Sequence, residues 1–71
     1  MKATYFFTET NTRLEMRKNR RITLEIPGEL FKHYDVDGME KYFRTYINEH
    51  VFHDSSIILK SIKIGNTHFQ L

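Results

Sequence analysis

Apolar side chains recur at helical spacing over residues 39–51. The repeating positions are Met39, Tyr42, Phe43, Tyr46, Ile47, His50 and Val51, which follow an i, i+3, i+4, i+7 pattern. Asp37 stands at the expected N-cap, and Glu40, three residues later, fits a capping box. Because one amphipathic helix cannot bury its own apolar stripe, we expect strands on either side of it to form a covering sheet.

Three strands are predicted before this helix. Tyr5-Phe6-Phe7 indicates a strand over residues 2–8, although the run is too continuous for simple alternation. Either both faces of this strand are covered or one aromatic ring is exposed. The polar residues 8–11 predict a turn. Alternation of apolar and polar residues then predicts strands over residues 12–17 and 21–26.

The connection between the second and third strands can be chosen by parity. A two-residue loop would place Leu14 opposite a threonine. A three-residue loop at 18–20 instead places Met16 opposite Ile22 and Leu14 opposite Leu24, all on one face. We therefore predict the three-residue loop, with Asn19 or Arg20 in the left-handed conformation and Asn19 the better candidate.

A second hairpin is predicted after the helix. Pro27-Gly28 ends the third strand, and a short helical turn over residues 29–34 leads to the main helix. Residues 57–64 form a strand whose alternation changes phase at Lys60-Ser61, which indicates a β-bulge or burial on both faces. Gly65-Asn66 fits a type II′ turn that places Ile64 opposite Thr67 and Ile62 opposite Phe69.

These elements predict an α+β fold, a five-stranded antiparallel sheet of order βββ-α-ββ with one amphipathic helix packed on one face. The other face of such a sheet can be solvated. Its predicted side chains are Arg13, Glu15, Arg17, Arg21, Thr23, Glu25, Ser61, Lys63, His68 and Gln70.

The chain has 71 residues, which predicts one domain over residues 1–71. It has no cysteine, so its core cannot depend on disulfides or thiolate metal sites, and its ten aromatic residues argue against disorder. No apolar run approaches the roughly 18–20 residues of a membrane span, and the first residues lack a signal-peptide pattern. We therefore expect a cytoplasmic protein that makes no membrane contact.

Charge is unevenly distributed although the net charge is only +2. Residues 12–21 hold five cations against Glu15, whereas residues 22–54 hold seven acids against three cations. A projecting basic hairpin can contact phosphates or an acidic partner, although cations also protect edge strands and keep small domains soluble. The predicted binding residues are Arg13, Arg17, Lys18, Arg20 and Arg21.

Other chemistry has little support in the sequence. His50 and His53, followed by Asp54, have a spacing that can bind a metal, but capping of the helix C-terminus explains them better. The segment Asp35-Val36-Asp37-Gly38 fails as a calcium loop because Arg44 takes the position of the required glutamate. No phosphate loop or nucleophile motif is present. We predict no enzyme activity, no cofactor and no metal.

Two functions therefore remain. The first is a small adaptor or inhibitor that docks on a larger protein or nucleoprotein complex through the basic hairpin. The alternative is direct nucleic-acid binding by the same hairpin. Self-association into a homodimer is a third possibility, since basic and acidic surfaces on one molecule can complement each other. The size and predicted strand order resemble some small phage-encoded inhibitors, anti-CRISPR proteins among them, and this resemblance is at the level of fold alone.

Overall fold

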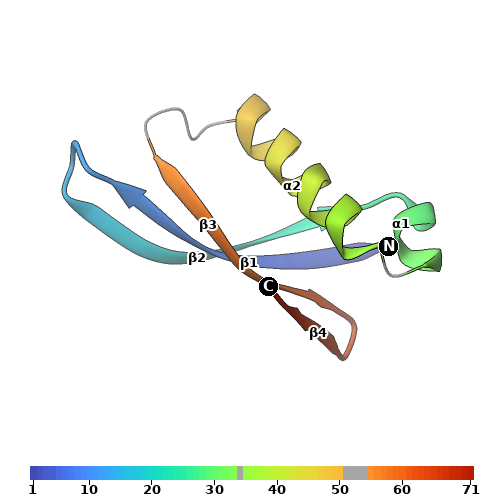
Figure 1. Ribbon diagram of the computed structural model, residues 1–71. Coiled ribbons are helices and arrows are strands. Elements are labelled where there is room, and N and C mark those ends of the chain that lie inside the picture. The colour runs from blue at the N-terminus through green and yellow to red at the C-terminus, as the bar shows by residue number, and fades with distance from the viewer. Residues whose placement is uncertain (34, 51–54) are drawn as a thin grey trace.

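A twisted antiparallel sheet with one long helix across one face forms the protein, in a computed structural model that describes residues 1–33, 35–50 and 55–71 (Figure 1). The elements are β1 (Lys2–Asn11), β2 (Met16–Glu25), α1 (Gly28–Lys32), α2 (Val36–His50), β3 (Ser56–Ile64) and β4 (Thr67–Gln70). The strand order is β2-β1-β3-β4. The predicted α+β class is confirmed. The predicted five strands are wrong, because the described residues form four.

The difference lies in the first two strands, which are each ten residues long. They pair without interruption from Lys2 opposite Glu25 to Asn11 opposite Met16, so the predicted turn at 8–11 and loop at 18–20 are both strand. Polar side chains support this pairing. The Thr8 hydroxyl donates to Asn19 Oδ1 at 3.1 Å, and the Arg20 guanidinium donates to Glu9 Oε1 at 2.8 Å. Cross-strand polar pairs thus stabilise a segment that lacks the apolar alternation of a strand.

The chain reverses instead at residues 12–15. The side-chain oxygen of Asn11 accepts hydrogen bonds from the backbone N–H groups of Arg13 and Leu14, at 3.0 and 3.2 Å. Glu15 has a φ of 50°, so it takes the left-handed conformation predicted for Asn19 or Arg20. The turn is therefore stabilised by the side chain of Asn11, which precedes it, and not by an asparagine inside the turn as predicted.

The new register also changes the predicted partners. Met16 lies opposite Asn11 and Ile22 lies opposite Tyr5, so the predicted pairing of Met16 with Ile22 is wrong. Leu14, predicted to pair with Leu24 on the apolar face, lies in the turn with 69% of its surface exposed.

The core lies between α2 and the odd-numbered residues of β1. Phe43 is fully buried, and its ring lies 4.8 Å from the ring of Tyr5 and 5.2 Å from that of Phe7. Met39 and Ile47 extend the same buried stripe of α2, which confirms the predicted helix. The Tyr5 hydroxyl donates to the Met39 carbonyl oxygen at 3.0 Å, and burial raises the pKa of Tyr5 to about 12. The only polar atom of this ring therefore has a partner.

The N-cap of α2 is Asp35, two residues before the position predicted for it. The Gly38 N–H donates to Asp35 Oδ1 at 2.9 Å, so the predicted cap at Asp37 is wrong. Glu40 makes no capping box and instead accepts a hydrogen bond from Arg44 at 3.4 Å, one turn later. The helix therefore begins at Val36, three residues before Met39, the first residue of the predicted apolar stripe.

The C-terminal hairpin confirms the predicted bulge. Phe6 pairs with Ser61 and Phe7 pairs with Leu59, so Lys60 is the additional residue on β3. Ile64 lies opposite Thr67, as predicted, and Gly65 has a φ of 57° at the turn. The bulge corrects the change of phase, so that apolar residues on both sides of it face the helix. These residues are Ile57, Leu59, Ile62 and Ile64.

The short helix α1 confirms the predicted helical turn, although Tyr34 lies outside the described residues. The βββ-α-ββ order, on which the resemblance to small phage-encoded inhibitors depends, is absent from the described structure. No helix within the described ranges is both long and apolar enough to cross a membrane.

Candidate functional site

The sheet face opposite α2, here called the open face, carries an excess of positive charge. It is formed by the even-numbered residues of β1 and by the β2, β3 and β4 residues paired with them. Figure 1 shows α2 above the sheet and no helix below it. The cations of this face are Lys2, Arg17, Arg21, Lys60 and Lys63. Eight of the ten outer-face side chains predicted from sequence lie on this face, whereas Arg13 and Glu15 lie in the turn at residues 12–15. The eight are Arg17, Arg21, Thr23, Glu25, Ser61, Lys63, His68 and Gln70.

Each strand positions its cations by simple alternation. Arg17 and Arg21 stand four residues apart on the edge strand β2, so both point to the open face. Lys63 on β3 lies opposite Thr4 of β1. Lys60 reaches the open face because of the bulge, and its ammonium group donates to Asn19 Oδ1 at 3.3 Å. Three strands thus contribute positive charge to one surface.

Little negative charge opposes these cations. Glu25 is the one acid of the open face within the described residues, and the Met1 amino group lies 2.6 Å from its Oε1 atom. That hydrogen bond and the charge of the amino group lower the pKa of Glu25 below its ordinary value. Arg17, Arg21 and Lys63 form no ion pair within the described part of the chain.

The helices have the opposite balance. The two helices and the turns beside them carry five acids against three cations, Lys32, Lys41 and Arg44. The acids are Glu29, Asp35, Asp37, Glu40 and Glu49. Glu9, Lys18 and Arg20 of the strands also point to this side, so the helix side is close to neutral while the open face is positive.

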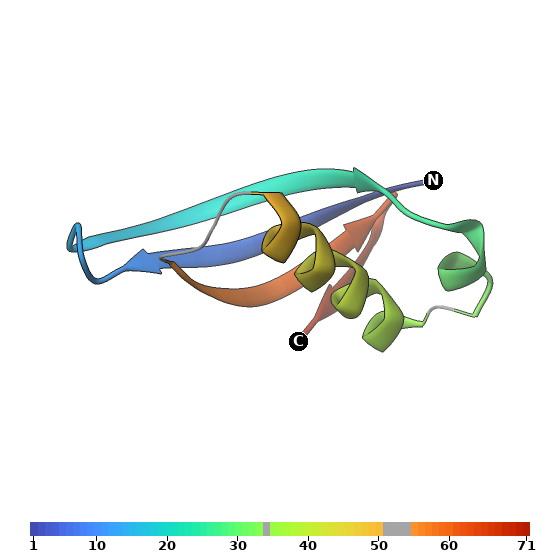
Figure 2. The same cartoon turned by 90° about the horizontal axis from the view of Figure 1, so that it is seen from above.

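The predicted basic finger does not form. Lys18 and Arg20 are predicted at a hairpin tip, but they lie within β2 and point to the helix side. Arg13 alone of these residues lies in the turn, at the end of the long β1–β2 hairpin that extends past α2 (Figure 2). The predicted loop at residues 18–20 is wrong because β2 continues beyond the area that the helix covers. Charged residues in that part of a strand have the same composition as a loop.

Arg20 contributes to the fold through a polar cluster on the helix side. Its guanidinium lies 2.8 Å from Oε1 of Glu9, and the Ser55 hydroxyl donates to Oε2 of Glu9 at 3.0 Å. Glu9 is only 5% exposed, and the hydrogen bond from Arg20 lowers the pKa of Glu9, with further help from Ser55 and the charge of Lys18. This buried carboxylate joins β1, β2 and the start of β3.

Two rings lie in contact on the open face, one on the inner strand β1 and one on the edge strand β4. Phe6 of β1 is half-buried, and its ring centroid lies 5.5 Å from that of His68 on β4, with a 33° angle between the planes. His68 is exposed, and its Nε2 atom lies 3.0 Å from the hydroxyl oxygen of Ser61. Phe6 is therefore the aromatic of the first strand that the helix leaves uncovered.

Two of the residues considered for metal binding, His53 and Asp54, lie outside the described residues. The ring of His50 stacks on that of Tyr46, with the ring centroids 4.2 Å apart. Within the described residues, no three His, Asp or Glu side chains are grouped as metal ligands. The acidic segment before α2 acts as a helix cap through Asp35.

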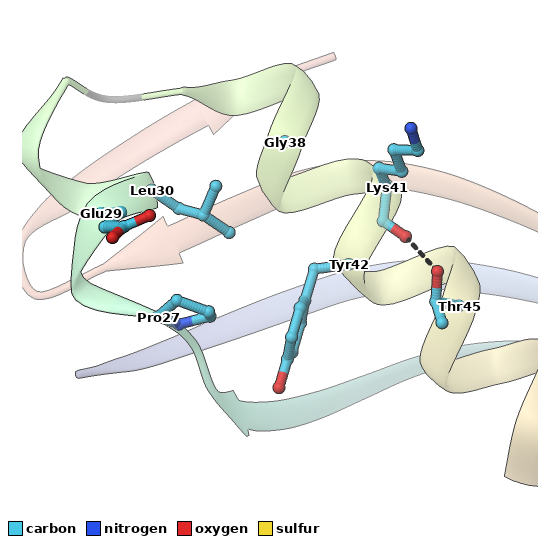
Figure 3. Close-up of a pocket in the computed structure, with 7 residues that line it drawn as sticks. All are labelled: Pro27, Glu29, Leu30, Gly38, Lys41, Tyr42 and Thr45. Carbon is cyan, nitrogen blue, oxygen red and sulfur yellow. Dashed lines mark hydrogen bonds between the residues drawn. The ribbon is translucent and has the colours of Figure 1, made fainter.

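An open hollow of about 400 Å³ lies between α1 and the first half of α2. Figure 3 shows Leu30, Pro27 and the ring of Tyr42 around it, while the amino group of Lys41 points away. The Thr45 hydroxyl donates to the Lys41 carbonyl oxygen at 3.0 Å, so it is already used within the helix. The lining offers mainly apolar contact.

Sequence reasoning placed Lys63 and His68 on the outer face but gave them no role, and it did not identify Phe6, Lys2 or Lys60. The signal for Phe6 was available, because three consecutive aromatics cannot all point to one side of a strand. The signal for Lys60 was the change of phase at Lys60-Ser61. No family model, curated protein or solved structure was found to match this chain.

Proposed function

We propose that the protein binds nucleic acid through the open face of its sheet, with the five cations of that face contacting phosphates. One observation carries the proposal: three strands place these cations on one surface where the only described acid already has a cationic partner. Lysine and arginine side chains that neutralise phosphates release counterions, which supplies most of the affinity of sequence-independent binding.

The acidic middle of the chain does not oppose this function. Along the sequence, the excess of acids over residues 22–54 would oppose a broad nucleic-acid footprint. In the fold, Asp37, Glu40 and Glu49 belong to α2, on the far side of the sheet from Arg17 and Arg21. Phosphates on the open face would be separated from these carboxylates by the whole sheet and would meet the cations first.

Docking on a larger acidic protein is the second candidate. Two exposed apolar side chains favour it, because apolar side chains contribute nothing to the binding of phosphates. Leu14 at the hairpin turn is 69% exposed, and Ile58 on β3 is 60% exposed. In this case the cations would steer the encounter and the apolar side chains would supply much of the affinity.

Charge reversal on one face tests the proposal. The variant R17E/R21E changes two cations of the open face, and the matched control K32E/K41E makes the same charge change on exposed positions of the helices. Fluorescence anisotropy with a labelled 15-nucleotide DNA at low salt should show a loss of at least tenfold for R17E/R21E and a small loss for the control.

Circular dichroism would first establish that both variants keep the wild-type fold. Equal losses in the two variants would indicate that only net charge matters, and no binding by the wild-type protein would refute the proposal. In that second outcome, the variant L14S/I58S would test whether an acidic protein partner uses the exposed apolar side chains.

A further inference from the structure

We infer that the ligand is a single strand, and that one of its bases stacks on the ring pair formed by Phe6 and His68. The inference rests on the proposed function and names the class of nucleic acid that the open face selects. It depends on a different observation from the cations, namely the two aromatic rings in contact on the same face.

The two rings form a small platform that the fold holds in place. Phe6 stands on the central strand β1, where β2 and β3 flank it with Arg21 on one side and Ser61 on the other. His68 comes from β4, and its hydrogen-bonding contact with Ser61, a residue only 6% exposed, fixes the position of its ring. A platform fixed in this way loses little side-chain freedom when a ligand binds.

One cation stands beside this platform, and a second stands on β3, the strand between the strands of its two rings. Arg21 lies directly opposite Phe6 on β2, and Lys63 lies directly opposite His68 on β3. These two strands are separated by β1, so the two cations arise roughly 10 Å apart across the sheet. A base stacked on the rings would leave its neighbouring phosphates within reach of these cations, which combines stacking with charge as in other proteins that bind single strands.

A duplex cannot use the platform in the same way. Its bases are already stacked and paired, so placing one on Phe6 would require the base to be flipped out of the helix. Phe6 also stands on an inner strand of the sheet, flanked by β2 and β3, from which it cannot enter a groove. The open face should therefore bind a duplex only through its phosphates.

The test compares two labelled 15-mers, oligo(dT) and an abasic oligomer with the same phosphates and no bases, with a 15-base-pair duplex as a third probe. The variants are F6L/H68Q, which removes both rings, and the control Y42L, which removes an exposed ring from the helix side. The wild-type protein and Y42L should bind oligo(dT) about tenfold more tightly than the abasic oligomer. F6L/H68Q should bind the two equally.

Each result has one meaning. Equal binding of oligo(dT) and the abasic oligomer by the wild-type protein would overturn stacking and leave the proposed function intact. Failure to bind any of the three probes would overturn the proposed function itself. Because Phe6 is half-buried, circular dichroism and a urea titration are needed to show that F6L/H68Q is folded, and H68Q alone provides a second variant that leaves Phe6 in place. Repeating the comparison with oligo(rU) extends the test to RNA, and the same dependence on bases with either sugar supports the inference.

Discussion

The salt dependence of binding should report how many cations of the open face contact phosphates. If Lys2, Arg17, Arg21, Lys60 and Lys63 each neutralise one phosphate of a single strand, the slope of log K against log salt should be about −3.5. Affinity should then fall about a hundredfold between 50 and 200 mM salt. Replacing Arg17 and Arg21 by glutamine leaves three cations, so the slope should become about −2.1 and the loss about twentyfold.

The measurement is an anisotropy titration of a labelled 15-nucleotide strand at four salt concentrations, with the wild-type protein, R17Q/R21Q and the control K32Q/K41Q. Lys32 and Lys41 lie on exposed positions of α1 and α2, so the control removes the same charge from the other side of the molecule. Its slope should equal that of the wild-type protein. An unchanged slope in R17Q/R21Q, or an equal reduction in K32Q/K41Q, would show that phosphates do not lie on the open face.

Three further predictions concern the fold. Phe43→Ala removes a fully buried ring and should cost about 3–5 kcal/mol, out of roughly 4–11 kcal/mol expected for a domain of this length, so thermal unfolding should show a variant that melts well below the wild-type protein. Asp35→Ala should lower the free energy of unfolding by about 1 kcal/mol, whereas Asp37→Ala should change it little because it removes no cap, and urea titrations of both would check this. The hydrogen bond from Arg20 lowers the pKa of Glu9, so its stabilisation is present above the ordinary glutamate pKa and is lost as pH falls through the folded-state pKa. Glu9→Gln should therefore lower stability at pH 7 and reduce its further loss between pH 5 and 3, as measured by urea midpoints, and an unchanged pH dependence would contradict this role.

The elements that could be predicted from the sequence are those in which apolar spacing and turn chemistry agree. The stripe of α2 predicts a helix because residues three and four apart share a face. The helix is confirmed, with Met39, Phe43 and Ile47 buried, although Tyr42 of the predicted stripe is exposed. The Gly65-Asn66 turn and the bulge at Lys60 are confirmed for a similar reason: each was required to keep apolar residues of β3 and β4 on one face. Parity works where both strands have enough apolar residues to test it.

The same reasoning failed where the sheet extends beyond the helix. There no core requires apolar side chains, so the ends of β1 and β2 are polar and resemble turns. What joins them is cross-strand chemistry between Thr8 and Asn19 and between Glu9 and Arg20. Such pairs lie 11 residues apart in the chain, and periodicity within one strand carries no information about them.

That failure also explains why the basic residues are arranged differently from the prediction. A hairpin reversing at residues 18–20 places Lys18 and Arg20 at its tip and the other three cations on one face, whereas the reversal at residues 12–15 retains only Arg17 and Arg21 of the five on the open face. The remaining positive charge of that face comes from β1 and β3, strands distant in sequence from the basic segment. A surface built from alternate residues of several strands has no contiguous signature, so its charge becomes visible only when the register is known. A register shifted by one residue would exchange Phe6 for Phe7 and the cations for the core, which makes the observed pairing of β1 with β2 and β3 the physical basis of the proposed function.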